Sequence, residues 1–203
     1  SLEITPEAKM IVRAPLRCSE KEIQDFILRK QKWVEKVIAQ QSKRIVLQIP
    51  SLLEEGTKIP LLGQWLPIGW ENQKEPSVGE NLVLPVKWKG PLLQKKLIRW
   101  LKSEAENYLT HRTKVWSSHI NVPFQTVTIT HAKKRLGSCN YKKQIRYTWR
   151  IMMLPPSLSD YIILHELAHI KVHSHGKAFW KILREWIPDL EERKNLFKQY
   201  IIH

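Results

Sequence analysis

The segment His165-Glu166-Leu167-Ala168-His169 is the part of the sequence that decides the fold of its surroundings. On an α-helix, residues four apart lie on the same face, so the imidazoles of His165 and His169 can reach one metal ion. Glu166 follows the first histidine by about 100° of helical rotation, which places its carboxylate beside that ion without making it a ligand. This pattern predicts a zinc site with a carboxylate next to the water that the metal activates.

The residues around this segment predict the helix that the motif requires. Pro155-Pro156 end the preceding strand, Ser157 is the predicted N-cap, and Asp160 stands at the capping-box position. The apolar side chains that would hold the helix in a core are Leu158, Tyr161, Ile162, Leu164, Leu167 and Ala168. Two histidines on a buried helix can also serve packing alone, and that alternative predicts no metal.

A catalytic zinc site needs a third protein ligand, and the sequence offers three candidates. His175 follows His165 by ten residues, a spacing that lets the chain leave the helix and turn back toward the metal. His173 would continue the helical face and is better suited to a position behind the ligands or in solvent. Glu185, in the next predicted helix, would supply a carboxylate. The spacing favours His175, and Glu185 and His173 remain as alternatives.

Five short motifs follow one another in the C-terminal part of the chain. They are Gly137-Ser138-Cys139-Asn140, Ile145-Arg146-Tyr147-Thr148-Trp149-Arg150, Leu154-Pro155-Pro156, residues 165–169, and His175-Gly176 with Phe179-Trp180. In this order they resemble the YgjP-like metallopeptidases, whose relatives are the SprT-like zinc peptidases. Leu136 departs from the family pattern, which usually has tryptophan there. The resemblance implies His165, His169 and His175 as zinc ligands and Glu166 as the general base.

Composition argues against a membrane protein and against a disulfide-rich secreted protein. Of the 203 residues 42% are apolar, enough for one or two cores, but no apolar run approaches the roughly 18 residues of a membrane-spanning helix. The first residues lack a signal-peptide pattern. Cys18 and Cys139 give neither a disulfide framework nor a Cys-x-x-Cys metal pair. We expect a protein of the reducing cytoplasm.

The chain is strongly basic, with 34 Lys and Arg residues against 19 Asp and Glu and a net charge of +15. Basic side chains cluster at Lys133-Lys134-Arg135 and at Lys142-Lys143, and Arg146 and Arg150 follow. We favour the interpretation of a solvated basic surface. Contact with nucleic acid phosphates is the alternative, and SprT-like peptidases that act on DNA-bound proteins support it by analogy only.

Residues 1–90 are predicted to form an N-terminal helix and a small β-rich lobe. The capping box Ser19-Glu20-Lys21-Glu22 begins a long amphipathic helix that extends to about Gln41, and we expect its apolar face in a core. Between Ile45 and Gly90, glycines and prolines separate short apolar pieces, which predicts hairpins.

Residues 91–203 are predicted to form the catalytic domain. An apolar stripe from Leu92 to Leu109 predicts a helix that covers the zinc helix. Strands around 127–129 and over 144–154 are expected to be antiparallel, the second being an edge strand that pairs with an extended substrate. Helices over 179–187 and 190–202 are expected to close the chain, with Asp189 as a cap.

These features together predict an α+β fold in which a zincin-like domain of antiparallel strands and a zinc helix follows the β-rich lobe. The predicted function is that of a zinc metallopeptidase, a hydrolase of protein or peptide substrates that uses Zn²⁺ and the general base Glu166. Two rival functions are a nucleic-acid-associated protein with a structural metal, and a hydrolase of non-peptide amides. The number of protein ligands distinguishes the peptidase from the first rival. A catalytic zinc site has three protein ligands plus water, whereas a structural zinc site has four protein ligands.

Overall fold

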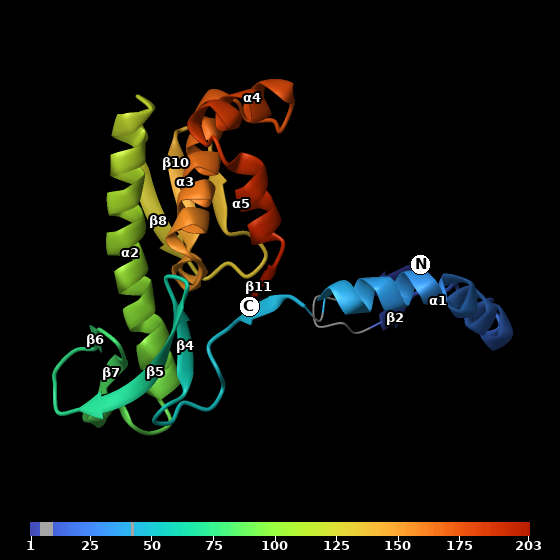
Figure 1. Ribbon diagram of the computed structural model, residues 1–203, viewed down its shortest axis with the longest axis horizontal. Coiled ribbons are helices and arrows are strands. Elements are labelled where there is room, and N and C mark those ends of the chain that lie inside the picture. Colours follow the sequence, from blue (N-terminus) through green and yellow to red (C-terminus); the bar gives the residue numbers. More distant parts are fainter. Residues whose placement is uncertain (5–9, 42) are drawn as a thin grey trace. The chain divides into compact units, whose positions relative to one another are not determined.

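The computed structural model describes residues 1–4, 10–41 and 43–203, and within them the fold is mixed α+β with five α-helices and small sheets (Figure 1). Contacts divide the chain into two compact units. Unit 1 comprises residues 1–46 and 198–201, and unit 2 comprises residues 47–197 and 202–203. The predicted division into domains after residue 90 stays a prediction. No helix of the described segments is long and apolar enough to cross a membrane.

Unit 1 contains a small hairpin and one long helix. Strands β1 (Leu2–Ile4) and β2 (Met10–Val12) pair antiparallel, and α1 spans Glu20–Gln41. The predicted capping box is confirmed: Ser19 N–H donates to the Glu22 carboxylate at 2.8 Å, and Glu22 N–H donates to Ser19 Oγ at 3.3 Å. The apolar face of α1 is only half-buried, contrary to the expected core, and its Trp33 is 45% exposed.

The end of the chain returns to a strand rather than continuing as a helix. Helix α5 (Leu190–Phe197) stops earlier than predicted, and β11 (Tyr200–Ile202) follows it. This strand pairs with β3 (Ile45–Leu47), which lies far away in the sequence. A strand of three residues that pairs with a distant segment cannot be recognised from its neighbours in the sequence, because strand formation depends on the partner.

The β-rich lobe of unit 2 is a four-stranded sheet in the order β4-β5-β7-β6. This confirms the prediction that short strands and hairpins form this part of the chain. Its strands are β4 (Lys58–Leu61), β5 (Gln64–Glu71), β6 (Ser77–Val78) and β7 (Leu82–Pro85), and the 3-10 turn η1 (Val86–Trp88) follows. Strand β5 is antiparallel to β4 and parallel to β7.

The turn between β4 and β5 contacts the segment that leads into the motif helix. Leu62 and Gly63 have φ angles of 47° and 80°, the combination found in tight two-residue hairpins. Leu62 N–H donates to the Met152 carbonyl at 2.6 Å. A Cβ on Gly63 would lie 2.9 Å from Pro155 Cα, so only glycine permits this approach. The lobe therefore helps to position the start of that helix.

The central sheet of unit 2 has the order β8-β10-β9, with β8 (Thr126–Thr130), β9 (Gly137–Cys139) and β10 (Gln144–Thr148). Strand β10 is parallel to β8 and antiparallel to β9. The predicted antiparallel pairing of the first and last strands is wrong, because the chain first turns into β9. The predicted edge strand is wrong too: β10 is central, β9 is an edge strand, and the 3-10 turn η2 (Trp149–Met153) follows β10.

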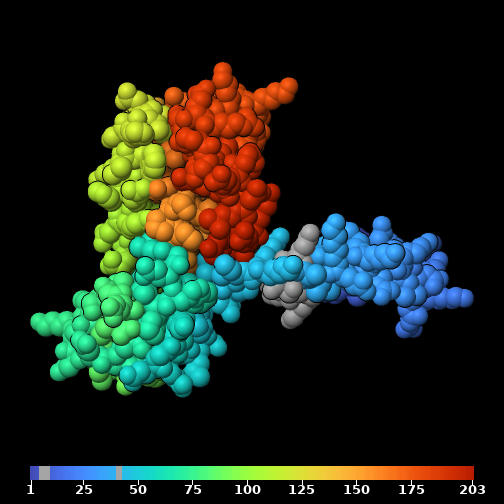
Figure 2. Space-filling model, viewed as in Figure 1, coloured from blue at the N-terminus to red at the C-terminus, as the bar shows by residue number. Residues whose placement is uncertain are grey.

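The helix that carries the motif packs against a second, longer helix. Helix α2 (Leu93–His119) buries Leu93, Leu97, Leu101, Ala105 and Leu109, a stripe with four-residue spacing. Helix α2 packs against α3 (Pro156–Lys171), the helix that carries the motif. This confirms the prediction that the helix after residue 91 covers the motif helix. In Figure 2 the side chains of the second half of α2 pack directly against those of the C-terminal helices.

Helix α3 begins differently from the prediction. Pro155 occupies the N-cap position and Pro156 the first turn, and no side chain caps the helix. Proline suits this place because its missing N–H would have no helical partner there. The predicted cap at Ser157 and capping box at Asp160 are therefore wrong.

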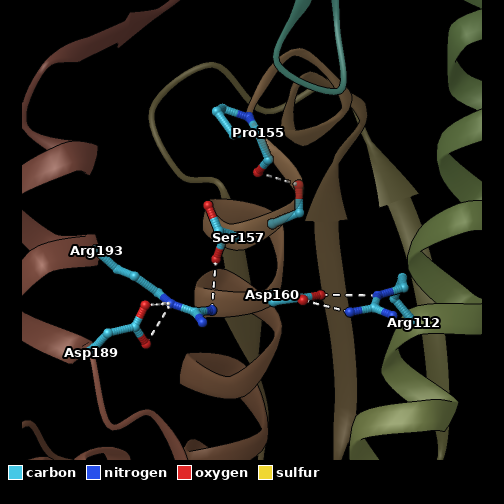
Figure 3. A network of polar contacts seen from close by, with 7 residues as sticks. Arg112, Pro155, Ser157, Asp160, Asp189 and Arg193 are labelled. Atoms are coloured by element: carbon cyan, nitrogen blue, oxygen red, sulfur yellow. Dashed lines mark hydrogen bonds and ion pairs between the residues drawn. The ribbon is translucent and has the colours of Figure 1, made fainter.

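Polar contacts at Asp160 and Ser157 instead connect α3 to its neighbours (Figure 3). The Arg112 guanidinium of α2 donates two hydrogen bonds to the Asp160 carboxylate, one of them at 3.0 Å. Arg193 of α5 donates to the Ser157 carbonyl at 3.0 Å and is paired with Asp189, the residue predicted as a cap. Asp160 is only 8% exposed, so removing Arg112 would leave a buried carboxylate without its partner.

Candidate functional site

Three histidines meet where α3 gives way to α4 (Lys177–Trp186). His165 and His169 project from one face of α3, and His175 returns from the connection between the helices. One ring nitrogen from each can be chosen so that all lie within 4.8 Å of one another, and His175 Nε2 is 3.0 Å from His165 Nε2. The three histidines predicted from the sequence therefore come together. Glu185 is exposed on α4 and lies outside this group.

The buried ring of Phe179 supports all three imidazoles. Its centroid is 4.9 Å from that of His165, 4.7 Å from that of His169 and 4.8 Å from that of His175. Phe179 belongs to an apolar cluster with Leu164, Ala168, Leu183, Ile187 and Leu190. This explains the phenylalanine of the Phe-Trp motif in physical terms, because its ring joins the histidine group to the core.

Burial keeps the histidines of α3 neutral. It lowers the pKa of His165 to about 3, with a smaller effect from the neighbouring His169 and His175, and it also lowers the pKa of His169. His169 Nδ1 lies 3.2 Å from the Val172 carbonyl. Since a carbonyl only accepts, Nδ1 carries the proton and Nε2 keeps its lone pair. Neutral imidazoles with a free lone pair are the form that binds a metal.

Glu166 supplies an unpaired carboxyl group next to the histidines in the sequence. The residue is 5% exposed, and its Oε2 has no hydrogen-bond partner among the described residues. Burial raises its pKa to about 8. A nearby cation would favour the ionised form and would supply the missing interaction. The site therefore fits a divalent metal, and its imidazole ligands suit zinc.

Gly137 of β9 faces the Glu166 side chain. A Cβ on Gly137 would lie 2.5 Å from Glu166 Oε1 and 2.7 Å from its Cγ, closer than non-bonded atoms approach. Only glycine therefore leaves room for the carboxylate in its present position. The sequence marked Gly137 merely as part of a turn motif, and no local pattern connects it to Glu166.

Two further side chains lie near the group. The Tyr141 ring, in the turn between β9 and β10, contacts the His173 ring at a tilted angle with centroids 4.0 Å apart, and both residues are exposed. Cys139 is a half-buried free thiol, and burial, together with the charge of Glu166, raises its pKa to about 11. It therefore stays protonated at neutral pH.

The basic clusters predicted as a surface are exposed except at one position. Lys133, Lys134 and Arg135 are exposed between β8 and β9, and Arg146 is exposed on β10. Arg150 is buried in η2 and does not belong to that surface. Nucleic acid binding by the exposed residues stays an untested alternative to a solvated surface.

Comparisons with known proteins agree with these motifs. Residues 1–200 match the family described as YgjP-like, metallopeptidase domain. Comparison with curated proteins gave no match.

Two solved structures are similar to part of the chain. The crystal structure of the metallopeptidase zymogen of Pyrococcus abyssi abylysin is 20% identical with a TM-score of 0.40, covering 44% of this chain and 90% of that one. That of Methanocaldococcus jannaschii jannalysin is 23% identical with a TM-score of 0.40, covering 45% and 94%. Because residues 1–200 match its model, the chain belongs to the YgjP-like metallopeptidase family.

Proposed function

We propose that the protein is a zinc-dependent peptidase with a zincin-like catalytic domain. His165, His169 and His175 would hold the metal, and Glu166 would act as general base. The observation that carries the proposal is the group of three imidazoles, one of which is followed in the sequence by Glu166, whose buried Oε2 has no hydrogen-bond partner among the described residues. Three protein ligands leave one position of a tetrahedral ion open, as a catalytic site requires.

Zinc bound there would supply Lewis acidity toward a water molecule and a carbonyl oxygen. The Glu166 carboxylate would accept the proton of the attacking water and then deliver it to the leaving amine. The Phe179 ring would keep the three imidazoles in place, and Gly137 would leave the space in which the carboxylate lies.

Strand β9, rather than the β10 of the sequence prediction, would pair with the substrate. It is an edge strand of its sheet and packs against α3. An extended peptide can add to such a free edge through backbone hydrogen bonds. Gly137 belongs to this strand, so a peptide bound along it would pass close to Glu166.

Hydrolysis of an unfolded protein tests the proposed function directly. We expect the purified protein to cleave denatured casein, to lose this activity on chelation, and to regain it when zinc is returned. Mass spectrometry of the products would identify cleaved peptide bonds. If the zinc-loaded protein cleaved neither casein nor a mixed peptide library, the proposal would be wrong.

Zinc binding should release about one proton from Glu166 at pH 7. The pKa of Glu166 is about 8 without metal, so the group is largely protonated at pH 7. A zinc ion beside it lowers that pKa, and the proton leaves. Calorimetric titration in buffers of different ionisation enthalpy would count the protons. We expect Glu166→Gln to release about one fewer, and equal counts would contradict this linkage.

Gly137→Ala should reduce hydrolysis while zinc stays bound. The added methyl group overlaps the Glu166 carboxylate, so the general base must move. Because a misplaced group costs on the order of 10²-fold in rate, we expect kcat to fall by about that factor. Gly79→Ala is a matched control, since nothing lies within 4 Å of its added Cβ and its φ is not in the left-handed region. Equal rates for both variants would exclude the proposed role of Gly137.

A further inference from the structure

The central sheet of unit 2 has an exposed face on the side away from Glu166. Successive side chains of a strand point to opposite faces, and a Cβ on Gly137 would meet Glu166, so the next residue, Ser138, lies on the other face. Ser138 is paired with Arg146 of β10, and Arg146 is paired with Thr128 of β8. Paired residues share a face, and both Arg146 and Thr128 are exposed. These three paired residues define what we call the outer face.

The charge around the outer face has one sign. The sequence contains no aspartate or glutamate from Asn107 to Ser159. The exposed cationic residues on β10 and in the segments that connect β8, β9 and β10 are Lys133, Lys134, Arg135, Lys142, Lys143 and Arg146. Neither Arg135 nor Arg146 forms an ion pair with a carboxylate of the described residues. Such a concentration of positive charge attracts an anionic partner.

A small pocket of about 180 Å³ lies among β9, β10 and the segment that leads into β9. Arg135, Ser138, Arg146 and Thr148 are among the residues that line it, and none of its lining residues is acidic. The hydroxyl Oγ1 of Thr148 is buried and has no hydrogen-bond partner among the described residues. Pockets that enclose a drug-sized molecule measure roughly 300–1,000 Å³, so this one suits a single side chain of a larger ligand.

A peptide paired with the edge strand β9 would bring every second side chain to the outer face. Neighbouring strands lie about 4.8 Å apart, so the peptide backbone would be about 10 Å from that of Arg146, two strands away. The residue between them is Ser138, whose small side chain leaves the path open. An arginine and a glutamate side chain together can span this distance. The remaining side chains of the peptide would face α3 and Glu166.

We propose that the protein selects substrate segments with an aspartate or glutamate, whose carboxylate binds to Arg146 and Arg135 on the outer face. The inference rests on the proposed peptidase function, because it takes β9 as the strand that pairs with the substrate. The fork of a guanidinium matches a planar carboxylate. Nucleic acid phosphates also suit the charge, but a pocket of this size beside the substrate strand favours a peptide side chain. Both arginines would determine specificity without touching the reacting atoms.

The affinities of three peptides that differ at one residue test the proposal. Each is a labelled, extended host peptide with Glu, Gln or Lys at its centre. Fluorescence anisotropy would measure binding to the zinc-loaded full chain with Glu166→Gln, in which cleavage should not consume the peptide. We expect the Glu peptide to bind about tenfold more tightly than the Gln peptide, because charge-assisted hydrogen bonds are lost in the amide. Equal affinity for these two peptides would overturn the proposal.

Charge reversal identifies the residues responsible. Arg135→Glu combined with Arg146→Glu should reverse the preference, so that the Lys peptide binds more tightly than the Glu peptide. A variant that merely misfolded would bind neither. Arg99→Glu combined with Arg184→Glu is the matched control, because it makes the same charge change at two exposed helical positions outside the pocket. The control should keep the preference for Glu. A preference that survived the reversal at Arg135 and Arg146 would refute their assignment.

Hydrolysis of the same peptides by the unchanged zinc-loaded protein separates this inference from the proposed function. Cleavage of the Glu and Gln peptides with equal kcat/KM would leave the peptidase in place and remove the acidic preference. Binding of the Glu peptide through the two arginines without cleavage of any peptide would support the carboxylate site and contradict the proposed function. A labelled DNA duplex that lost affinity on charge reversal, while the Glu and Gln peptides bound equally, would assign the outer face to nucleic acid instead.

Discussion

Glu166→Gln is expected to leave zinc bound and to lower kcat for peptide hydrolysis by about 10²- to 10⁴-fold, the range typical of a general base. Glutamine has nearly the same shape as glutamate but cannot accept the proton of the attacking water. The buried position tolerates an uncharged group, since burial already favours the protonated form of Glu166. The fold should therefore remain intact. A fluorogenic peptide assay, with zinc measured in the same samples, would give the effect.

Glu185→Gln is the matched control for this variant. Glu185 carries the same carboxylate but is exposed on α4, outside the histidine group. We expect its kcat to stay close to that of the unchanged protein. If metal-loaded Glu166→Gln hydrolysed peptides as fast as this control, Glu166 would have no part in the proton transfer.

Loss of any one of His165, His169 and His175 should weaken zinc binding by about 10³-fold. This factor follows when the binding free energy of a structural zinc site, about 10–16 kcal/mol, is divided equally among its ligands. Competition with a chromophoric chelator would measure the affinity of each alanine variant. Loss of a residue that only supports the ligands typically costs 10- to 100-fold. We therefore expect a smaller effect for His173→Ala, and none for Glu185→Ala.

The reverse order would contradict the assignment of the third ligand. If Glu185→Ala lost zinc while His175→Ala retained it, the site would use a carboxylate in place of His175. Circular dichroism of both variants would show that the fold survives the substitution, as we expect because His175 and Glu185 are exposed.

Elements with a strong local signal were predicted well from the sequence. The spacing of His165 and His169 and the apolar stripe of α2 both follow the helical period, which depends on neighbours a turn apart. The return of His175 to the same group followed from its distance along the chain and from the family motif. In each case the deciding information lies within a few turns of the residues concerned.

Features that depend on distant contacts were not predictable in this way. The parallel pairing of β8 and β10 results from the insertion of β9 beside β10, which alternation of apolar residues cannot reveal. Asp160 was predicted to be a capping residue from its place near the start of the helix. Its observed partner, Arg112, lies 48 positions earlier, so the nearby sequence gave no sign of the pair. Gly137 and Glu166 are likewise far apart in the sequence. Their contact appears only once β9 packs against α3.

The ligand sphere of the bound metal tests the central claim most directly. X-ray absorption at the zinc edge of the purified protein should show three imidazole nitrogens at about 2.0–2.1 Å and one further oxygen from water, as in an open catalytic site. Calorimetry should give one zinc per chain. A sulfur ligand at about 2.3 Å, which would implicate Cys139, or a closed shell of four protein ligands would contradict the account.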